Sequence, residues 1–165
     1  MRKFIALVSF ALVLTSCKNP YLENSLAENI NRAEELLNFE HVHMTTGTRY
    51  KQTAKFDLQN SKIIFTNIDI SSGEQFNSVL NLNDILTSKG VQFEEVYSPN
   101  VNWTQSFQIR TKANSINRDA ILTMRTPEYD MFFVVPPKNL ADSEAFRNEL
   151  TLRTLAIIEQ AKNKI

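Results

Sequence analysis

Two histidines set two positions apart, His41 and His43, have the most ligand-like chemistry in this sequence. On an extended segment both imidazoles point to the same side, so they could bind one metal ion with Glu40 or Met44 close by. No third ligand follows at a spacing typical of a metal site. The favoured interpretation is a histidine pair on a solvated strand edge or loop, with metal binding as the alternative.

A second group of candidate binding residues is a row of cations on the first predicted hairpin, namely Arg49, Lys51, Lys55 and Lys62. Such a row could bind an anionic ligand. More often, cations on the outer face of a strand stay solvated and protect the sheet from pairing with another chain. We therefore favour a structural role for these four residues and keep ligand binding as the alternative.

Residues suited to catalysis are few. The chain has no Gly-x-Ser-x-Gly stretch and only two histidines that could act as a base. Adjacent pairs such as Glu94 and Glu95 point apart instead of converging. Three glycines leave no glycine-rich phosphate-binding loop, and the single cysteine excludes a disulfide. The sequence thus predicts no enzyme and no cofactor, and a hydrolase with scattered residues is the less favoured alternative.

That single cysteine, Cys17, follows a distinctive N-terminal segment. Arg2 and Lys3 precede a run over residues 4–14 that is apolar except for Ser9. This run is shorter than the roughly 20 residues needed to span a bilayer but has the length of a signal-peptide core. Small residues, Thr15 and Ser16, then lead to Cys17. The segment therefore predicts a cleaved export signal.

The stretch Leu14-Thr15-Ser16-Cys17 resembles the lipobox of bacterial lipoproteins, in which an aliphatic residue and two small residues precede cysteine. The resemblance implies diacylglycerol on the Cys17 sulfur, cleavage before Cys17 and acylation of the new amino terminus. Two or more acyl chains would give a stable membrane anchor. Lys18 stands where Asp would imply retention in the inner membrane, so the outer membrane of the cell envelope is favoured.

These features divide the chain into a signal peptide (1–16), a lipidated tether (17–24) and one globular domain (25–165). Loss of Arg2 and Lys3 would leave two more acidic than basic side chains. This balance gives no strong positive field, so nucleic acid is not a predicted partner.

Hydrophobic periodicity predicts an α+β domain. Ser25 and Glu28 fit a capping box that starts a helix over 26–38. A single helical turn closed by Gly90 is expected at 83–89, and Asp142 is the expected N-cap of the last helix. Alternation of apolar and polar residues predicts seven strands, followed by a helix over 142–162; the strands cover 48–58, 62–70, 76–82, 91–97, 103–110, 120–125 and 131–135.

Short connections favour an antiparallel sheet of seven strands that curls into a barrel or sandwich, with the C-terminal helix packed on it. Residues 78–85 and the strand at 132–135 leading into the last helix are similar to pleckstrin-homology-like domains. That resemblance implies a bent barrel capped by the terminal helix. It also implies that the first hairpin could hold an anionic lipid head group at the row of cations named above.

Three further expectations concern apolar residues. Trp103 is expected in the core. The last helix is apolar on two sides, because Leu152 and Leu155 lie away from the face of Phe146 and Leu150. We expect the second side to contact the sheet or the first helix, with a docking surface for another protein as the alternative.

The sequence therefore favours an envelope lipoprotein whose non-catalytic domain binds another protein, as an assembly accessory or an immunity-type inhibitor. The alternative is a carrier of a small ligand or lipid. In such a carrier Trp103, Phe107 and Phe56 would line an apolar cavity.

Overall fold

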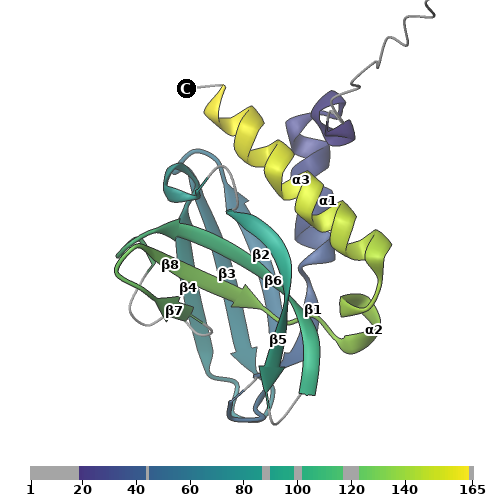
Figure 1. The fold of residues 1–165 in the computed structure, drawn as a ribbon, viewed down its shortest axis with the longest axis vertical. Helices are drawn as coiled ribbons and strands as arrows, with labels where there is room; N and C mark the ends of the chain where they lie inside the picture. The colour runs from purple at the N-terminus through teal and green to yellow at the C-terminus, as the bar shows by residue number, and fades with distance from the viewer. Residues whose placement is uncertain (1–18, 44, 87–89, 99–101, 117–122, 164–165) are drawn as a thin grey trace, which may run out of the picture.

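The computed structural model describes residues 19–43, 45–86, 90–98, 102–116 and 123–163, and has an α+β fold (Figure 1). Two four-stranded antiparallel sheets lie against each other, and two long helices cover one side. The predicted signal peptide and lipobox, residues 1–17 with Leu14, Thr15, Ser16 and Cys17, lie outside the described residues. Within the described part of the chain, no helix is both long and apolar enough to cross a membrane.

The first long helix, α1 (Leu26–Leu36), begins as its sequence predicts. The Ser25 hydroxyl accepts a hydrogen bond from the Glu28 backbone N–H at 3.2 Å. The reciprocal half of the expected capping box is replaced, because Glu28 Oε1 accepts instead from Asn24 Nδ2 at 3.1 Å. An N-cap of this kind stabilises a helix by about 1 kcal/mol.

The first sheet is a meander in the order β1-β2-β3-β4. Its strands are β1 (Phe39–Val42), β2 (Arg49–Asp57), β3 (Lys62–Asp69) and β4 (Gln75–Asn81). In β2 the predicted alternation is confirmed, since Tyr50, Gln52, Ala54 and Phe56 are buried and the residues between them face outward. One face of this sheet therefore packs in the core.

The second sheet has the order β5-β6-β8-β7. Its strands are β5 (Val91–Ser98), β6 (Asn102–Lys112), β7 (Thr123–Arg125) and β8 (Tyr129–Val134). Between the sheets the chain passes through a 3₁₀ turn, η2 (Leu82–Asp84). Gly90 is required there, because a Cβ atom on it would lie 1.7 Å from the Leu86 carbonyl oxygen.

The antiparallel α+β fold is confirmed, but the single curled sheet of seven strands is wrong. The described residues form eight strands in two separate sheets and no closed barrel. The extra strand is β1, whose four residues, Phe-Glu-His-Val, are too few to show a period of two. Residues 120–122 of the predicted sixth strand and 87–89 of the expected helical turn lie outside the described residues.

The core lies between the two sheets. Phe65 of β3 and Phe132 of β8 are fully buried, and their ring centroids are 4.4 Å apart. Phe107 and Ile109 of β6 are also fully buried on the inner face of the second sheet. Because aromatic rings from both sheets interlock here, this cluster holds the sandwich together.

A short helix, α2 (Lys138–Ala141), precedes the last helix, α3 (Glu144–Lys162). The expected N-cap, Asp142, is wrong by one residue. Asp142 instead ends α2 and forms an ion pair with Lys138 at 2.9 Å, while the Ser143 hydroxyl accepts from the Phe146 N–H at 3.3 Å. Helix α3 packs on the second sheet, where the Phe146 and Phe93 rings are 6.2 Å apart.

Charged side chains join α1 to α3. Arg32 Nε and Nη2 donate to the two carboxylate oxygens of Glu149 at 3.0 and 3.3 Å. Arg153 also donates to Glu149, at 2.9 Å, and to Asn29 at 3.1 Å. Hydrogen bonds from Arg32 hold the pKa of Glu149 below its ordinary value. Glu149 is therefore ionised at neutral pH and links two helices that are far apart in the sequence.

The residues before α1 also pack on α3. A 3₁₀ turn, η1 (Pro20–Glu23), places the Tyr21 ring 4.2 Å from the Arg153 guanidinium carbon. Asn19 Nδ2 donates to the Leu152 carbonyl at 2.7 Å, and Gln160 Nε2 donates to the Asn24 carbonyl at 2.8 Å. The described part of the predicted tether, from Asn19 onward, therefore belongs to the folded body.

Candidate functional site

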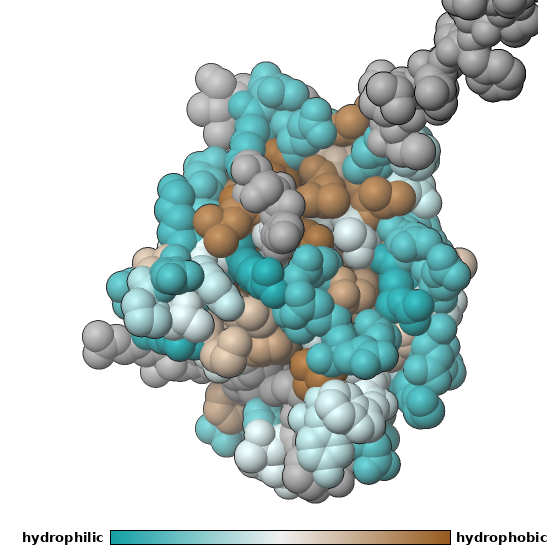
Figure 2. All heavy atoms as spheres, viewed as in Figure 1, coloured by the Kyte–Doolittle hydropathy of each residue, from teal (hydrophilic) through white to brown (hydrophobic). Residues whose placement is uncertain are grey.

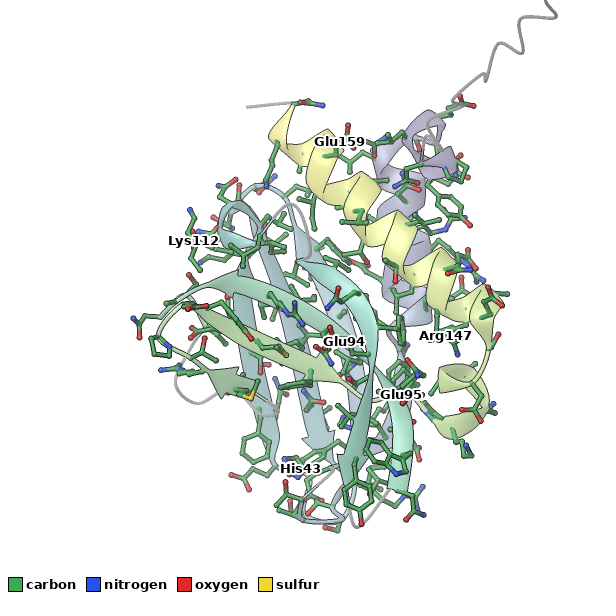
Figure 3. All side chains as sticks on the ribbon, in the orientation of Figure 1. His43, Glu94, Glu95, Lys112, Arg147 and Glu159 are labelled. Atoms are coloured by element: carbon green, nitrogen blue, oxygen red, sulfur yellow. The ribbon has the colours of Figure 1, made fainter. Side chains whose placement is uncertain are left out.

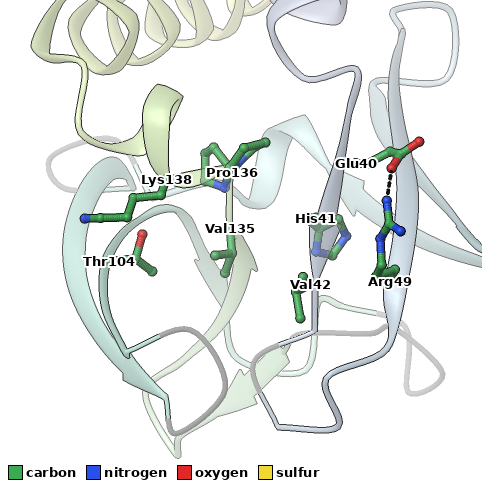
Figure 4. A pocket seen from close by; sticks show the side chains of 9 residues that line it. Glu40, His41, Val42, Arg49, Thr104, Val135, Pro136 and Lys138 are labelled. Carbon is green, nitrogen blue, oxygen red and sulfur yellow. Dashed lines mark hydrogen bonds and ion pairs between the residues drawn. The ribbon is translucent and has the colours of Figure 1, made fainter.

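A cavity of about 430 Å³ opens between the edge strand β1 and the segment that follows β8 (Figure 4). Two prolines shape one wall, since they lack a backbone N–H and end the pairing of β8 as the sequence predicts. Thr104 of β6 adds a hydroxyl. The full lining is Glu40, His41, Val42, Arg49, Thr104, Val135, Pro136, Pro137 and Lys138.

His41 lies in the wall of this cavity and is only 4% exposed. Its Nε2 is 2.9 Å from Asn67 Oδ1, an acceptor, so Nε2 carries the proton. Its Nδ1 has no hydrogen-bond partner among the described residues. Burial lowers the pKa of His41 below its ordinary value. His41 is thus a neutral imidazole at neutral pH, with one nitrogen able to accept a hydrogen bond.

His43 lies on the same side of the chain as His41, as predicted, because both rings contact the Tyr50 ring at centroid distances of 5.8 and 6.2 Å. His43 Nδ1 accepts hydrogen bonds from the Thr45 and Thr46 N–H groups at 3.3 and 3.2 Å. Among the described residues, no group of three or more His, Cys, Asp or Glu side chains is arranged to hold a metal ion.

Neutral His41 makes stability depend on pH. The unfolded chain takes up a proton at the ordinary pKa of histidine, whereas the folded chain does so only at lower pH. The free energy of unfolding should therefore fall as the pH is lowered from about 7 to about 5. The variant H41Q, whose amide can still bond to Asn67, should reduce this slope in chemical denaturation at a series of pH values.

The matched variant H43Q is the control for this slope. His43 is only half-buried, and burial lowers its pKa too. We expect H43Q to remove a smaller part of the pH dependence than H41Q. An unchanged slope in H41Q would contradict the assignment of a neutral, buried His41.

The four cations of the predicted basic row are all exposed on the outer face of the first sheet. They do not form one cluster. Arg49 is paired with Glu40 at 2.7 Å, and Lys62 lies opposite Asp57 at the other end of β2. The eight residue-to-residue steps from Arg49 to Asp57 span roughly 27 Å of strand. The geometry therefore gives no single pocket for an anionic head group at Arg49, Lys51, Lys55 and Lys62.

The expectation for Trp103 is wrong, because its side chain is 64% exposed. It lies opposite Tyr97, which is 57% exposed, across the β5–β6 hairpin, and the ring centroids are 5.1 Å apart. Phe56 and Phe107, by contrast, are buried in the core. Position explains the difference, since both exposed rings lie at the end of the hairpin where β5 connects to β6, away from the buried core residues Phe107 and Ile109.

Comparisons with known proteins do not add a function to these features. No family model, curated protein or solved structure matches this chain. The case for function therefore rests on the chemistry of the described residues and on the N-terminal motif.

Two features of the candidate site were missed by sequence reasoning. The break at Ser98-Pro99-Asn100 gave a partial signal for the aromatic pair, because it places Tyr97 just before and Trp103 soon after the connection of two strands. The cavity beside β1 had no local signal. It forms because β1 meets Val135 and the two prolines, residues almost a hundred positions away.

Proposed function

We propose that this chain is a lipoprotein of the bacterial cell envelope whose domain binds another protein and catalyses no reaction. The segment Leu14-Thr15-Ser16-Cys17 supports the lipid anchor on Cys17, and Lys18 favours the outer membrane over the inner. The observation that carries protein binding is the exposed pair of Tyr97 and Trp103.

Exposed Trp and Tyr side chains side by side are typical of binding surfaces. These two residue types dominate the energetics of protein interfaces, since each buries a large apolar area with few rotatable bonds. Thr104, the residue after Trp103, lines the cavity next to the unpaired edge of β1. Successive side chains of a strand point to opposite faces, so Thr104 and the cavity lie on the other face of β6 from Trp103, and the aromatic pair by itself is the proposed binding surface.

The position of the pair also supports this proposal. The hairpin that carries Tyr97 and Trp103 lies at the opposite end of the body from the point where the chain enters at Asn19 (Figure 1). His43 lies at the hairpin end, and Glu159 of α3 at the other end (Figure 3). With Cys17 in a membrane, the aromatic pair would face away from the lipid. It would then be available to another envelope protein, either in an assembly to which this chain is an accessory or as the protein that this chain inhibits.

A pleckstrin-homology-like fold stays part of the proposal. Two antiparallel sheets followed by a long terminal helix support it. The eight strands of the described residues, instead of seven, and the helix α1 before β1 are differences from that family's outline.

Removal of the indole tests the binding surface. W103A should reduce recovery of a crosslinked partner from intact envelopes at least tenfold, because a central Trp commonly contributes about 2 kcal/mol or more to binding. The free energy of unfolding should change little, since Trp103 is mostly exposed. The matched control is M124A, which removes another exposed large apolar side chain, on β7. Equal recovery with W103A and M124A would contradict the proposed surface.

A further inference from the structure

An apolar groove of about 450 Å³ lies beside the C-terminal half of α3. Leu152, Leu155 and Ile158 of α3 form one wall, and Leu86 adds to the lining. Figure 2 shows hydrophobic residues gathered at the end of this face where the chain enters the body. Asn19 is itself part of the lining.

The entry of the chain is fixed relative to this groove. Asn19 donates its hydrogen bond to Leu152, a residue of the groove wall, at 2.7 Å. Tyr21 is held against Arg153, and the carbonyl of Leu22 accepts from Gln160 at 3.3 Å. The first described residue therefore cannot move away from α3 without breaking several contacts.

Chain length then limits the distance to the proposed anchor. Two peptide units separate Cys17 from Asn19, and each joins Cα atoms about 3.8 Å apart. The Cα atom of Cys17 thus lies within about 8 Å of that of Asn19. Any membrane that holds a lipid on Cys17 lies equally close to the groove.

We infer that the groove beside α3 is the membrane-facing surface of the body. It lies at the boundary between the head groups and the acyl chains of the phospholipid bilayer that holds Cys17. The inference rests on the proposed lipidation of Cys17. Leu152 and Leu155 are half-buried in the isolated body, so contact with lipid removes their remaining exposed apolar surface from water. Glu159 and Lys162, the charged residues of the lining, then lie among the head groups. The body keeps one orientation, with Trp103 turned away from the bilayer.

Quenching by brominated phospholipid tests this contact, because bromine on acyl chains quenches only nearby tryptophan. The full chain is purified with its lipid and reconstituted in phosphatidylcholine vesicles with or without brominated acyl chains. W103F removes the single native tryptophan, and L155W then places one in the groove. Its emission should be more than halved by the brominated lipid. The second variant, K162W, places the reporter at a partly exposed position of the same lining, closer to the head groups, and should be quenched less than L155W but clearly more than A145W.

Two controls complete the design. The native Trp103 and A145W, an exposed position in the first turn of α3 about 15 Å along the helix from Leu155, should be quenched little. If L155W does not fold by circular dichroism, K162W decides alone.

Mass spectrometry of the N-terminal peptide separates the two ways of failing. If the protein is lipidated and folded but the tryptophans of L155W and K162W are quenched no more than that of A145W, the membrane contact of the groove is wrong and the proposed function still stands. That result would also follow if an acyl chain of Cys17 or another protein filled the groove. Absence of lipid on Cys17 would overturn both the inference and the proposed function.

Discussion

Bacteria expressing the C17S variant are expected to incorporate no labelled palmitate into this protein. Cys17 is the only cysteine, so no other thiol can accept the diacylglycerol. A serine hydroxyl cannot form the thioether. The resemblance to the lipobox implies a signal peptidase that cleaves before the lipidated cysteine. The variant should therefore also keep its signal peptide, which a mass increase of the isolated protein would reveal.

The matched control is S16A, which keeps a small residue at the position before the cleavage site. It should incorporate palmitate and remain in the membrane fraction like the unaltered chain. C17S protein that is processed and membrane-bound to the same extent as S16A protein would remove the basis for the lipoprotein assignment.

The F132A variant should lose about 3–5 kcal/mol of unfolding free energy, the usual cost of deleting a buried phenyl ring from a close-packed core. Phe132 is 1% exposed and lies between the sheets, where its ring meets Phe65. It also lies opposite Ile109 across the β6–β8 pair. Removal of the ring therefore leaves a cavity that neither sheet can close alone. Urea denaturation followed by circular dichroism measures the loss.

Phe133 provides the comparison, since it is the next residue on β8 and points to the other face of the sheet, where it is only partly buried. F133A should cost clearly less than F132A. Similar losses in the two variants would contradict a core centred between the sheets.

Much of the secondary structure could be predicted, because the long strands show a clear alternation of apolar and polar residues. In β2, four buried residues alternate with outward-facing ones over nine positions, so the period of two is unmistakable. The division into two sheets had no such signal. The chain leaves the first sheet through η2 and enters the second near Gly90, and the helical turn expected here does not by itself indicate that the next strand belongs to a different sheet.

The candidate site was harder to predict, since it depends on position more than on residue type. Tryptophan is usually buried, but Trp103 lies at the end of a hairpin that extends past the core. His41 was expected on a solvated strand edge or loop. It does lie on an edge strand, but its side chain is buried and faces Asn67, so the expected solvation is wrong. Neither burial nor exposure follows from the local pattern at these positions.

The contact of the first helix with the last one has a consequence for the order of folding. Arg32 and Glu149 are separated by 117 positions, and Asn19 and Leu152 by 133. Contacts between such distant residues form late, because a long loop must close before they stabilise anything. Until α3 is available, α1 and η1 lack their partner. A chain exported in the extended state would therefore complete its native structure only after its last twenty or so residues have crossed the membrane.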